Sequence, residues 1–446
     1  MRSLLGRFHR PMSRGAMGDM LTMNSLGDGS TLSLDFTAMG GVLDTRLNFT
    51  RSTTATYINS SGYVTSAAIN DPRFDYSPTN IGEPRGLLIE GQATNLCLQS
   101  NSLATTWTVA NTNTPSVVSP SVNDPFGGTQ TWKIVPTAGL AYHAIRQNFA
   151  SLGTSTYTIS CFVKAAQYDK FIISDLTNGI AAATFDLTAA TATPVAGGST
   201  PTARITAYAN GWYRCEMTVA FIYVGATGLS FSGYPTGATI GAYGAQFNPN
   251  GTDGIYMAGA QVELSSASAP ASSYIPTSAS QETREVDTAI IAAGTNFSSW
   301  YTGGTTGTFV TEWCRCSPTT TQRTVIATSD VPNQHLHQYI AATTSRLRLA
   351  DKVPAFIETA NASVDNSINK GAFSYAGSVQ SLCLNGGTVV PGTLAFSVAP
   401  TFLSIGGPST NGTSITDTAV VLNNAIRKIK YFPTRLSDAK IKEITT

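Results

Sequence analysis

Residues 157–165 read YTISCFVKA, and residues 211–219 read GWYRCEMTV. Cys161 alternates in step with Tyr157, Ile159 and Val163 in the first run, and Cys215 alternates in step with Tyr213, Met217 and Val219 in the second. A period of two is typical of a β-strand that turns one face toward a core. We therefore predict two strands of a sandwich, with both thiols pointing inward.

The amino-acid composition of the whole chain also favours β-structure. Only 12% of the 446 residues are charged, against about 25% in ordinary soluble proteins. Short polar side chains, which suit turns and outward strand faces and are poor in helix interiors, replace them. The net charge of +1 gives no extended positive field for nucleic acid. An all-β protein without nucleic-acid binding is expected.

No targeting signal is evident. No apolar run approaches the roughly 18 residues of a membrane span. Near the start, Arg7, His9, Arg10 and Pro11 interrupt the stretch that a secretion signal would need. The sequence predicts synthesis in the cytoplasm, with no signal peptide and no membrane insertion.

Turn signals divide the chain into four parts. Residues 1–31 lack a sustained period and predict an extended arm or tether. Residues 32–95 hold short β-like pieces, too interrupted for a rich core, so we expect them to pack on a neighbour or another subunit. Residues 96–284 predict a jelly-roll-like sandwich whose exit loop, 265–280, leads to a linker, and residues 285–446 predict a second sandwich.

Two local signals in the last part are specific. Asn385-Gly386, between apolar alternations, predicts a type I′ hairpin turn, because both central residues must take positive φ. After Pro433 a short C-terminal helix is expected, capped by Ser437, with Leu436 packing on Ile441.

Residues 48–64 read NFTRSTTATYINSSGYV, and residues 69–96 read INDPRFDYSPTNIGEPRGLLIEGQATNL. This long pattern resembles one found in bacteriophage virion proteins of the head-fibre, head-spike, decoration or tail-fibre type. The resemblance rests on Arg51, Ala55, Thr56 and Tyr57, on Pro72 to Asp75, on Gly86 to Leu88, on Glu90 and on Thr94 to Leu96.

The two later modules also resemble known types. Residues 157–165, 210–214 and 254–287 are similar to carbohydrate-binding jelly rolls. Residues 381–387, 404–407 and 426–441 resemble a concanavalin A-like or laminin-G-like sandwich.

The resemblance implies a structural, non-enzymatic component of a phage particle, anchored to other virion proteins through its N-terminal region. It also implies a homotrimer, as is usual for such fibres. The alternatives are a carbohydrate-binding adhesin that recognises host-surface glycans and, less favoured, a capsule depolymerase. The pattern leaves open whether the chain sits on the head, neck or tail.

Charged residues of the segment 32–95, which we call the phage-type segment because of this resemblance, suggest structure rather than catalysis. A glycoside hydrolase needs two carboxylates that converge on a cavity, whereas Glu90, Glu216, Glu263 and Glu312 are each isolated in strand-like contexts. We expect an ion-pair network that holds long loops, since Arg presents a rigid fork to carboxylates. Its predicted members are Arg51, Arg73, Asp75, Arg85 and Glu90.

Sugar binding requires an exposed aromatic ring beside polar donors, because a sugar has apolar faces and polar edges. Trp212 belongs to a structural motif and is expected to be packed. The candidates for sugar binding, all in the first sandwich, are Trp107, Trp132, Tyr142, His143 and Arg146.

Metal and cofactor signals are faint. His335 and His337 share a strand face without further ligands, as do Cys314 and Cys316, so no metal or cofactor is expected. Asn248, Asn250 and Asp253 echo a calcium loop without its closing Glu, and turn formation explains them more simply. Reduced thiols are the default for Cys161 and Cys215, although a disulfide between them remains open.

Overall fold

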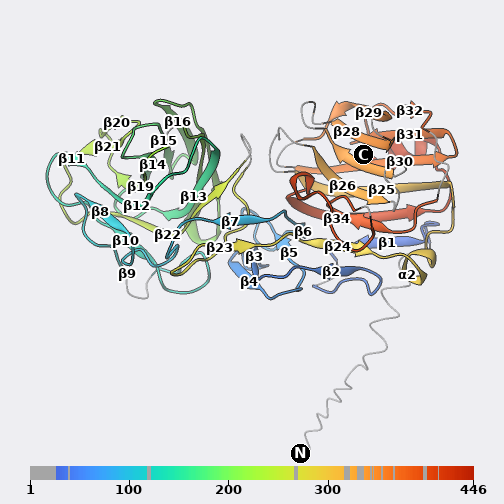
Figure 1. Ribbon diagram of the computed structural model, residues 1–446, viewed down its shortest axis with the longest axis horizontal. Coiled ribbons are helices and arrows are strands. Elements are labelled where there is room, and N and C mark those ends of the chain that lie inside the picture. Colours follow the sequence, from blue (N-terminus) through green and yellow to red (C-terminus); the bar gives the residue numbers. More distant parts are fainter. Residues whose placement is uncertain are drawn as a thin grey trace, which may run out of the picture.

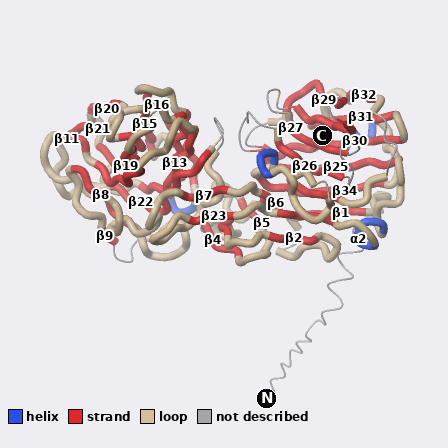
Figure 2. Tube along the Cα trace, in the orientation of Figure 1, coloured by secondary structure: helices blue, strands red, loops and turns tan. Residues whose placement is uncertain are grey.

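The computed structural model describes residues 27–38, 41–117, 122–222, 224–265, 270–315, 322–328, 336–341, 344, 346–352, 355–364, 367–394, 399–409 and 411–446. In this part of the chain nearly all regular structure is β, arranged as two sandwiches side by side with the phage-type segment beneath and between them (Figures 1 and 2). No helix among these residues has the length and apolarity to cross a bilayer. The all-β expectation is confirmed.

The first sandwich packs two six-stranded antiparallel sheets and is formed by one contiguous stretch of chain. One sheet has the order β17 (Thr202–Ala207), β18 (Trp212–Ala220), β13 (Thr156–Lys164), β22 (Ile255–Leu264), β10 (Trp132–Ile134), β9 (Ser116–Val117). The other has the order β16 (Thr191–Ala196), β15 (Ala181–Asp186), β14 (Lys170–Asp175), β19 (Thr227–Tyr234), β12 (Ala144–Phe149), β8 (Thr108–Ala110). A small third sheet comprises β11 (Ala141–Tyr142), β21 (Gly244–Phe247) and β20 (Thr239–Gly241).

The alternating runs 157–165 and 211–219 are neighbours in this sandwich. They form β13 and β18, with Cys161 directly opposite Cys215 in the antiparallel register. Both thiols are fully buried in the first core, which confirms that they point inward. Trp212 is also fully buried, as expected for a packing residue.

The second sandwich is discontinuous in sequence. One sheet has the order β32 (Val390–Gly392), β31 (Val379–Leu384), β30 (Ser367–Ala376), β25 (Thr306–Arg315), β34 (Asn424–Phe432), β6 (Pro84–Ile89), β5 (Phe74–Tyr76), with β1 (Leu32–Asp35) also paired to β34. The other has the order β2 (Asn48–Thr50), β24 (Thr288–Ile291), β33 (Leu403–Ile405), β26 (Arg323–Thr328), β27 (Leu336–Ile340), β28 (Arg346–Lys352), β29 (Ala355–Ala362).

Residues 32–95 are therefore not a separate unit, and the boundary predicted at 285 is wrong for the second sandwich. β1 and β6 pair with different parts of β34, and β2 pairs with β24. Apolar side chains of the segment, including Leu34 and Leu87, belong to the same core as Trp313. The segment has too few apolar residues for its own core, so it completes another one.

Two short β-ribbons lie at the junction of the sandwiches. β7 (Ala93–Asn95) pairs with β23 (Glu282–Arg284), and β3 (Ala55–Ile58) pairs with β4 (Val64–Ala67). The segment 270–277, predicted as part of a loop to a linker, instead packs here, with Tyr274 and Ile275 buried. An apolar pair in a Ser-rich loop was the signal for this packing.

Helical structure is limited to short pieces in the described residues. These are α2 (Thr295–Ser298), α3 (Asp438–Thr445) and the 3₁₀ turns η1 (Ala209–Gly211) and η2 (Thr418–Val420). In α3 the Ser437 side chain accepts a hydrogen bond from Lys440 N, and Leu436 and Ile441 join one apolar cluster. Asn385 and Gly386 have φ values of 49° and 64°. Both local predictions are confirmed.

Candidate functional site

A cluster of five buried charged side chains lies where the phage-type segment meets residues 284–287. Arg51 Nη1 lies 3.0 Å from Asp287 Oδ1. Arg73 pairs with Asp287 Oδ2 and, at 2.6 Å, with Glu90 Oε2, and Arg284 Nη1 lies 3.0 Å from the same Glu90 oxygen. Each residue is at most 5% exposed. We call these five residues the charge cluster; its three arginines and two carboxylates pair with one another rather than with water.

Strand ends position the charge cluster. Arg73 immediately precedes β5, Glu90 immediately follows β6, and Arg284 ends β23. Backbone groups at these ends complete the network: Glu90 N donates to Asp287 Oδ2 at 2.8 Å. The loop at 273 also contributes, since Ser273 N donates to Glu90 Oε1 at 2.8 Å and Ser273 Oγ donates to Glu90 Oε2 at 2.6 Å.

The charge cluster fixes protonation states. Burial by itself would raise the pKa of Glu90, but Arg284, Arg73 and the hydrogen bonds from Ser273 lower it to about 2. Burial would lower the pKa of Arg73, but Asp287 and Glu90 raise it above its ordinary value. Glu90 is therefore ionised throughout the physiological range and is no general acid.

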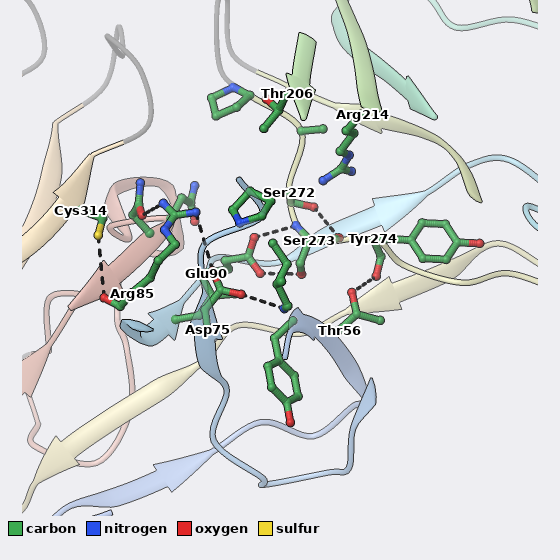
Figure 3. Close-up of a pocket in the computed structure, with 18 of the residues that line it drawn as sticks. Thr56, Asp75, Arg85, Glu90, Thr206, Arg214, Ser272, Ser273, Tyr274 and Cys314 are labelled. Atoms are coloured by element: carbon green, nitrogen blue, oxygen red, sulfur yellow. Dashed lines mark hydrogen bonds and ion pairs between the residues drawn. The ribbon is translucent and has the colours of Figure 1, made fainter. Parts of the chain in front are cut away.

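A cavity of about 180 Å³, which we call the junction cavity, adjoins the charge cluster and is lined by residues of both sandwiches and of the phage-type segment. In Figure 3, Thr206 and Arg214 face Asp75, Arg85 and Glu90 across this space. Pockets for drug-sized ligands occupy roughly 300–1,000 Å³, so this junction cavity suits something smaller.

Arg214 and Glu216 line the junction cavity from β18, where a spacing of two places them on one face. Arg214 is 5% exposed, lies over the Phe162 ring at 5.6 Å and donates to Ser160 Oγ at 3.1 Å. Its buried Nε has no partner among the described residues. Glu216 accepts from Ala271 N at 2.9 Å through Oε2, and the described residues give Oε1 no donor.

Asp75 lines the opposite side of the junction cavity. Its Oδ1 accepts from Ile58 N at 2.8 Å, and its Oδ2 lies 3.7 Å from Arg85 Nη1, an ion pair without a hydrogen bond. Burial raises the pKa of Asp75 above its ordinary value, against the lowering effect of Arg85. Arg85 itself is half-buried and donates to Asn424 Oδ1 at 3.0 Å.

The expectation that the carboxylates are isolated is wrong. Asp75, Glu90 and Glu216 line one cavity. Glu263 lies close by and accepts from Ser272 N and Ser272 Oγ, both at 2.6 Å. They converge because β18 and β22 flank β13 in one sheet and the loop at 271–273 links their outer faces to Glu90. Glu312 lies apart and pairs with Arg427 at 2.7 Å.

Three predicted sugar-binding residues are buried, which corrects the expectation of exposed rings. Trp107 and Trp132 are each 9% exposed, and their indole N–H groups donate to the carbonyls of Gln99 and Asn101. His143 is 2% exposed, and its ring nitrogens face backbone carbonyls. Because backbone acceptors satisfy their polar atoms, these rings pack at little cost and offer no surface.

The other two predicted sugar-binding residues remain accessible. Tyr142 is half-buried, with its ring centroid 6.5 Å from that of Tyr243, which is 46% exposed. Arg146, on β12, is half-buried, and its buried Nε has no hydrogen-bond partner in the described chain. Tyr243 was not predicted from the sequence, because its proximity to Tyr142 depends on the pairing of β11 with β21.

The calcium-like turn uses its own oxygens. Asn250 Oδ1 accepts from Thr252 N and Asp253 N, and Asn248 Oδ1 accepts from Gly139 N. Among the described residues no group of three His, Cys, Asp or Glu side chains is placed to hold a metal ion. His335, Cys316 and the side chain of His337 lie outside the described residues.

The buried cysteines have the character of unreactive thiols. Cys97, Cys161 and Cys215 are free and fully buried in the first core. Burial raises the pKa of all three thiols well above its ordinary value. A thiol that stays protonated is a poor nucleophile and metal ligand.

Comparison with known proteins gives partial structural likenesses. No family model and no curated protein matches the chain. A carbohydrate-binding module of the Ruminococcus gnavus intramolecular trans-sialidase, bound to α2,3-sialyllactose, has 15% identity and a TM-score of 0.27, covering 32% of this chain and 83% of its own.

Two further solved structures overlap in part. Domain 4 of a Geobacillus stearothermophilus arabinanase, with arabinotriose, has 11% identity and a TM-score of 0.29, covering 40% of this chain and 82% of its own. Mouse laminin α1 domains LG4-5 have 11% identity and a TM-score of 0.23, covering 66% and 88%. At such scores no statement about function follows.

Proposed function

We propose that this chain is a non-enzymatic structural protein of a bacteriophage particle, an appendage that displays two firmly joined β-sandwiches. One observation carries the proposal. The residues through which the sequence resembles phage appendages build the junction between the sandwiches: Arg51, Arg73 and Glu90 belong to the charge cluster. A segment whose distinctive residues are buried in ion pairs serves architecture.

Asn95, at the end of the phage-type segment, supports the same role. It is fully buried, and its side-chain amide donates to the carbonyls of Ala260 and Ile275. Its Oδ1 accepts from Cys97 N and Val262 N, both at 3.0 Å. A single side chain thus fastens the phage-type segment to β22 of the first sandwich.

In this proposal the N-terminal region binds other virion proteins and the appendage is a homotrimer made in the host cytoplasm. The test is mass spectrometry of purified particles of the phage whose genome encodes the chain. We expect the chain in stoichiometric amount in wild-type particles and its loss when residues 1–30 are deleted. Its absence from purified wild-type particles would contradict the proposal.

The non-enzymatic part has its own test, because Asp75 and Glu216 line one cavity. Purified protein is incubated with host capsular polysaccharide, and released reducing ends are measured beside an Asp75→Asn variant. We expect no release above a no-protein control. Release that Asp75→Asn abolishes would replace the structural proposal with a depolymerase.

A second candidate function, recognition of host-surface glycans, is favoured by the ring pair of the half-buried Tyr142 and the exposed Tyr243. The ring pair supplies the apolar face that a sugar requires, and the half-buried Arg146 of the same sandwich is the candidate donor. The test is a glycan array with Tyr243→Ala and Arg146→Ala, with Arg46→Ala as the surface control. Binding retained in both variants would eliminate this surface.

A further inference from the structure

Three polar groups that line the junction cavity, on Arg214, Glu216 and Asp75, have unused hydrogen-bonding capacity. Among the described residues the Arg214 side chain makes one hydrogen bond, to Ser160, although a guanidinium carries five donors. Glu216 Oε1 and Asp75 Oδ2 accept no hydrogen bond from the described residues. Three groups, each about 95% buried, thus bring both donors and acceptors to one space.

This mixture restricts what the junction cavity accepts. A small anion would meet the carboxylates of Asp75 and Glu216, and a small cation would meet Arg214. A hydroxyl group both donates and accepts, so a polyhydroxylated neutral ligand satisfies both kinds of wall. Tyr208 and Tyr57 also line the cavity and provide ring surface for the C–H faces of a sugar.

Size and access agree with a small ligand. The volume of about 180 Å³ is below the roughly 300–1,000 Å³ of pockets for drug-sized ligands, which favours one sugar ring over a chain. Tyr57, Arg204 and Thr206 are half-buried lining residues and connect the cavity to solvent. Thr206 lies on β17, the edge strand of its sheet.

We propose that the junction cavity binds one neutral saccharide residue, with Arg214 donating to its hydroxyls and Glu216 and Asp75 accepting from them. This site is separate from the surface around Arg146. Binding at this site does not depend on incorporation into a particle. Failure of the binding test would therefore leave the proposed structural function untouched, and the reverse also holds.

The test uses the full chain and saturation-transfer NMR with glucose, galactose, mannose and N-acetylglucosamine at millimolar concentration. We expect transfer to at least one sugar. Arg214→Met retains the aliphatic stem over Phe162 and removes the donors. It is expected to weaken binding by about tenfold or more, the effect of losing a charge-assisted hydrogen bond.

A second variant avoids dependence on a buried arginine. Thr206→Trp fills the cavity from the edge strand and should abolish binding, while Thr202→Trp, at an exposed position of the same strand, should leave it unchanged. The proposal is overturned if no sugar receives transfer from wild type. It is equally overturned if binding persists in Thr206→Trp, or if acetate binds and the sugars do not.

Discussion

The two sandwiches have similar layered architecture but are assembled differently. All the strands of the first come from one stretch of chain, β8 to β22, whereas the second takes β1, β2, β5 and β6 from a segment that lies before the first in sequence. The first is thus inserted into the second. The phage-type segment therefore completes one core and, through the charge cluster, joins the chain entering the inserted sandwich to the chain leaving it.

The largest expected effect comes from separating the two sandwiches. A fragment of residues 96–280 should fold alone, because its core lies within that range. A fragment of residues 285–446 should not fold, because without β6 and β1 the strand β34 loses a partner along most of its length. Circular dichroism and thermal melts of both fragments check this. A cooperative melt of 285–446 would refute the discontinuous second core.

Breaking the charge cluster tests the connection between the sandwiches. Arg73→Ala leaves Glu90 and Asp287 as buried carboxylates that lack their shared partner, and should lower the free energy of unfolding by about 3–5 kcal/mol. The matched control is Arg46→Ala, which removes a partly exposed ion pair with Asp44 and should cost about 1 kcal/mol or less. Denaturant titration measures both. Equal losses of unfolding free energy in Arg73→Ala and Arg46→Ala would show that the charge cluster does not stabilise the connection between the sandwiches.

Acid should weaken the same connection. The pKa of Glu90 falls from 4.5 to about 2 on folding, so its contribution is present above pH 4.5 and is lost as the pH falls toward 2. The shift corresponds to stability on the order of 3 kcal/mol. Asp75, whose pKa is raised, acts in the opposite direction. Glu90→Gln should make the free energy of unfolding depend less on pH between pH 4.5 and 2, as measured by denaturant titration at each pH. An unchanged slope would show that other groups cause the acid sensitivity.

The smallest effect concerns the pairing of β6 with β34. Gly86 has a φ of 115°, and a Cβ there would lie 2.2 Å from Ile426 O. Gly86→Ala should cost about 2–3 kcal/mol through backbone strain and displacement of β34. Gly241→Ala, where a Cβ meets no atom within 4 Å, is the control. Thermal melts should show a loss for the first variant only, and a neutral Gly86→Ala would contradict the close approach.

Local patterns predicted much of this fold. Alternation placed Cys161 and Cys215 in the core, Asn385-Gly386 gave the hairpin, and Ser437 capped the helix, because each depends on neighbours along the chain. The pairing of β6 with β34 joins residues more than 300 positions apart, and the hydrophobic periodicity of either strand does not show which strand it pairs with. For this reason the second sandwich appeared to begin at 285.

The candidate site was less accessible to sequence reasoning. Arg51, Arg73 and Glu90 were predicted to form ion pairs, and the structure brings them together. Arg284 and Asp287, which follow the inserted sandwich in the sequence, complete the charge cluster and were not predicted. The aromatic residues Trp107 and Trp132 were predicted to be exposed. They are buried because the fold places backbone carbonyls where these accept hydrogen bonds from the indole N–H groups, and sequence patterns do not show this.

Hydrogen exchange measured by mass spectrometry tests the central claim most directly, by following peptides from β6, β24 and β13 in wild type and Arg73→Ala. If the phage-type segment belongs to the second core and the charge cluster secures it, β6 and β24 are strongly protected in wild type. Both then lose protection together in the variant, while β13 keeps its own. Rapid exchange of β6 in wild type beside a protected β24 would contradict the account.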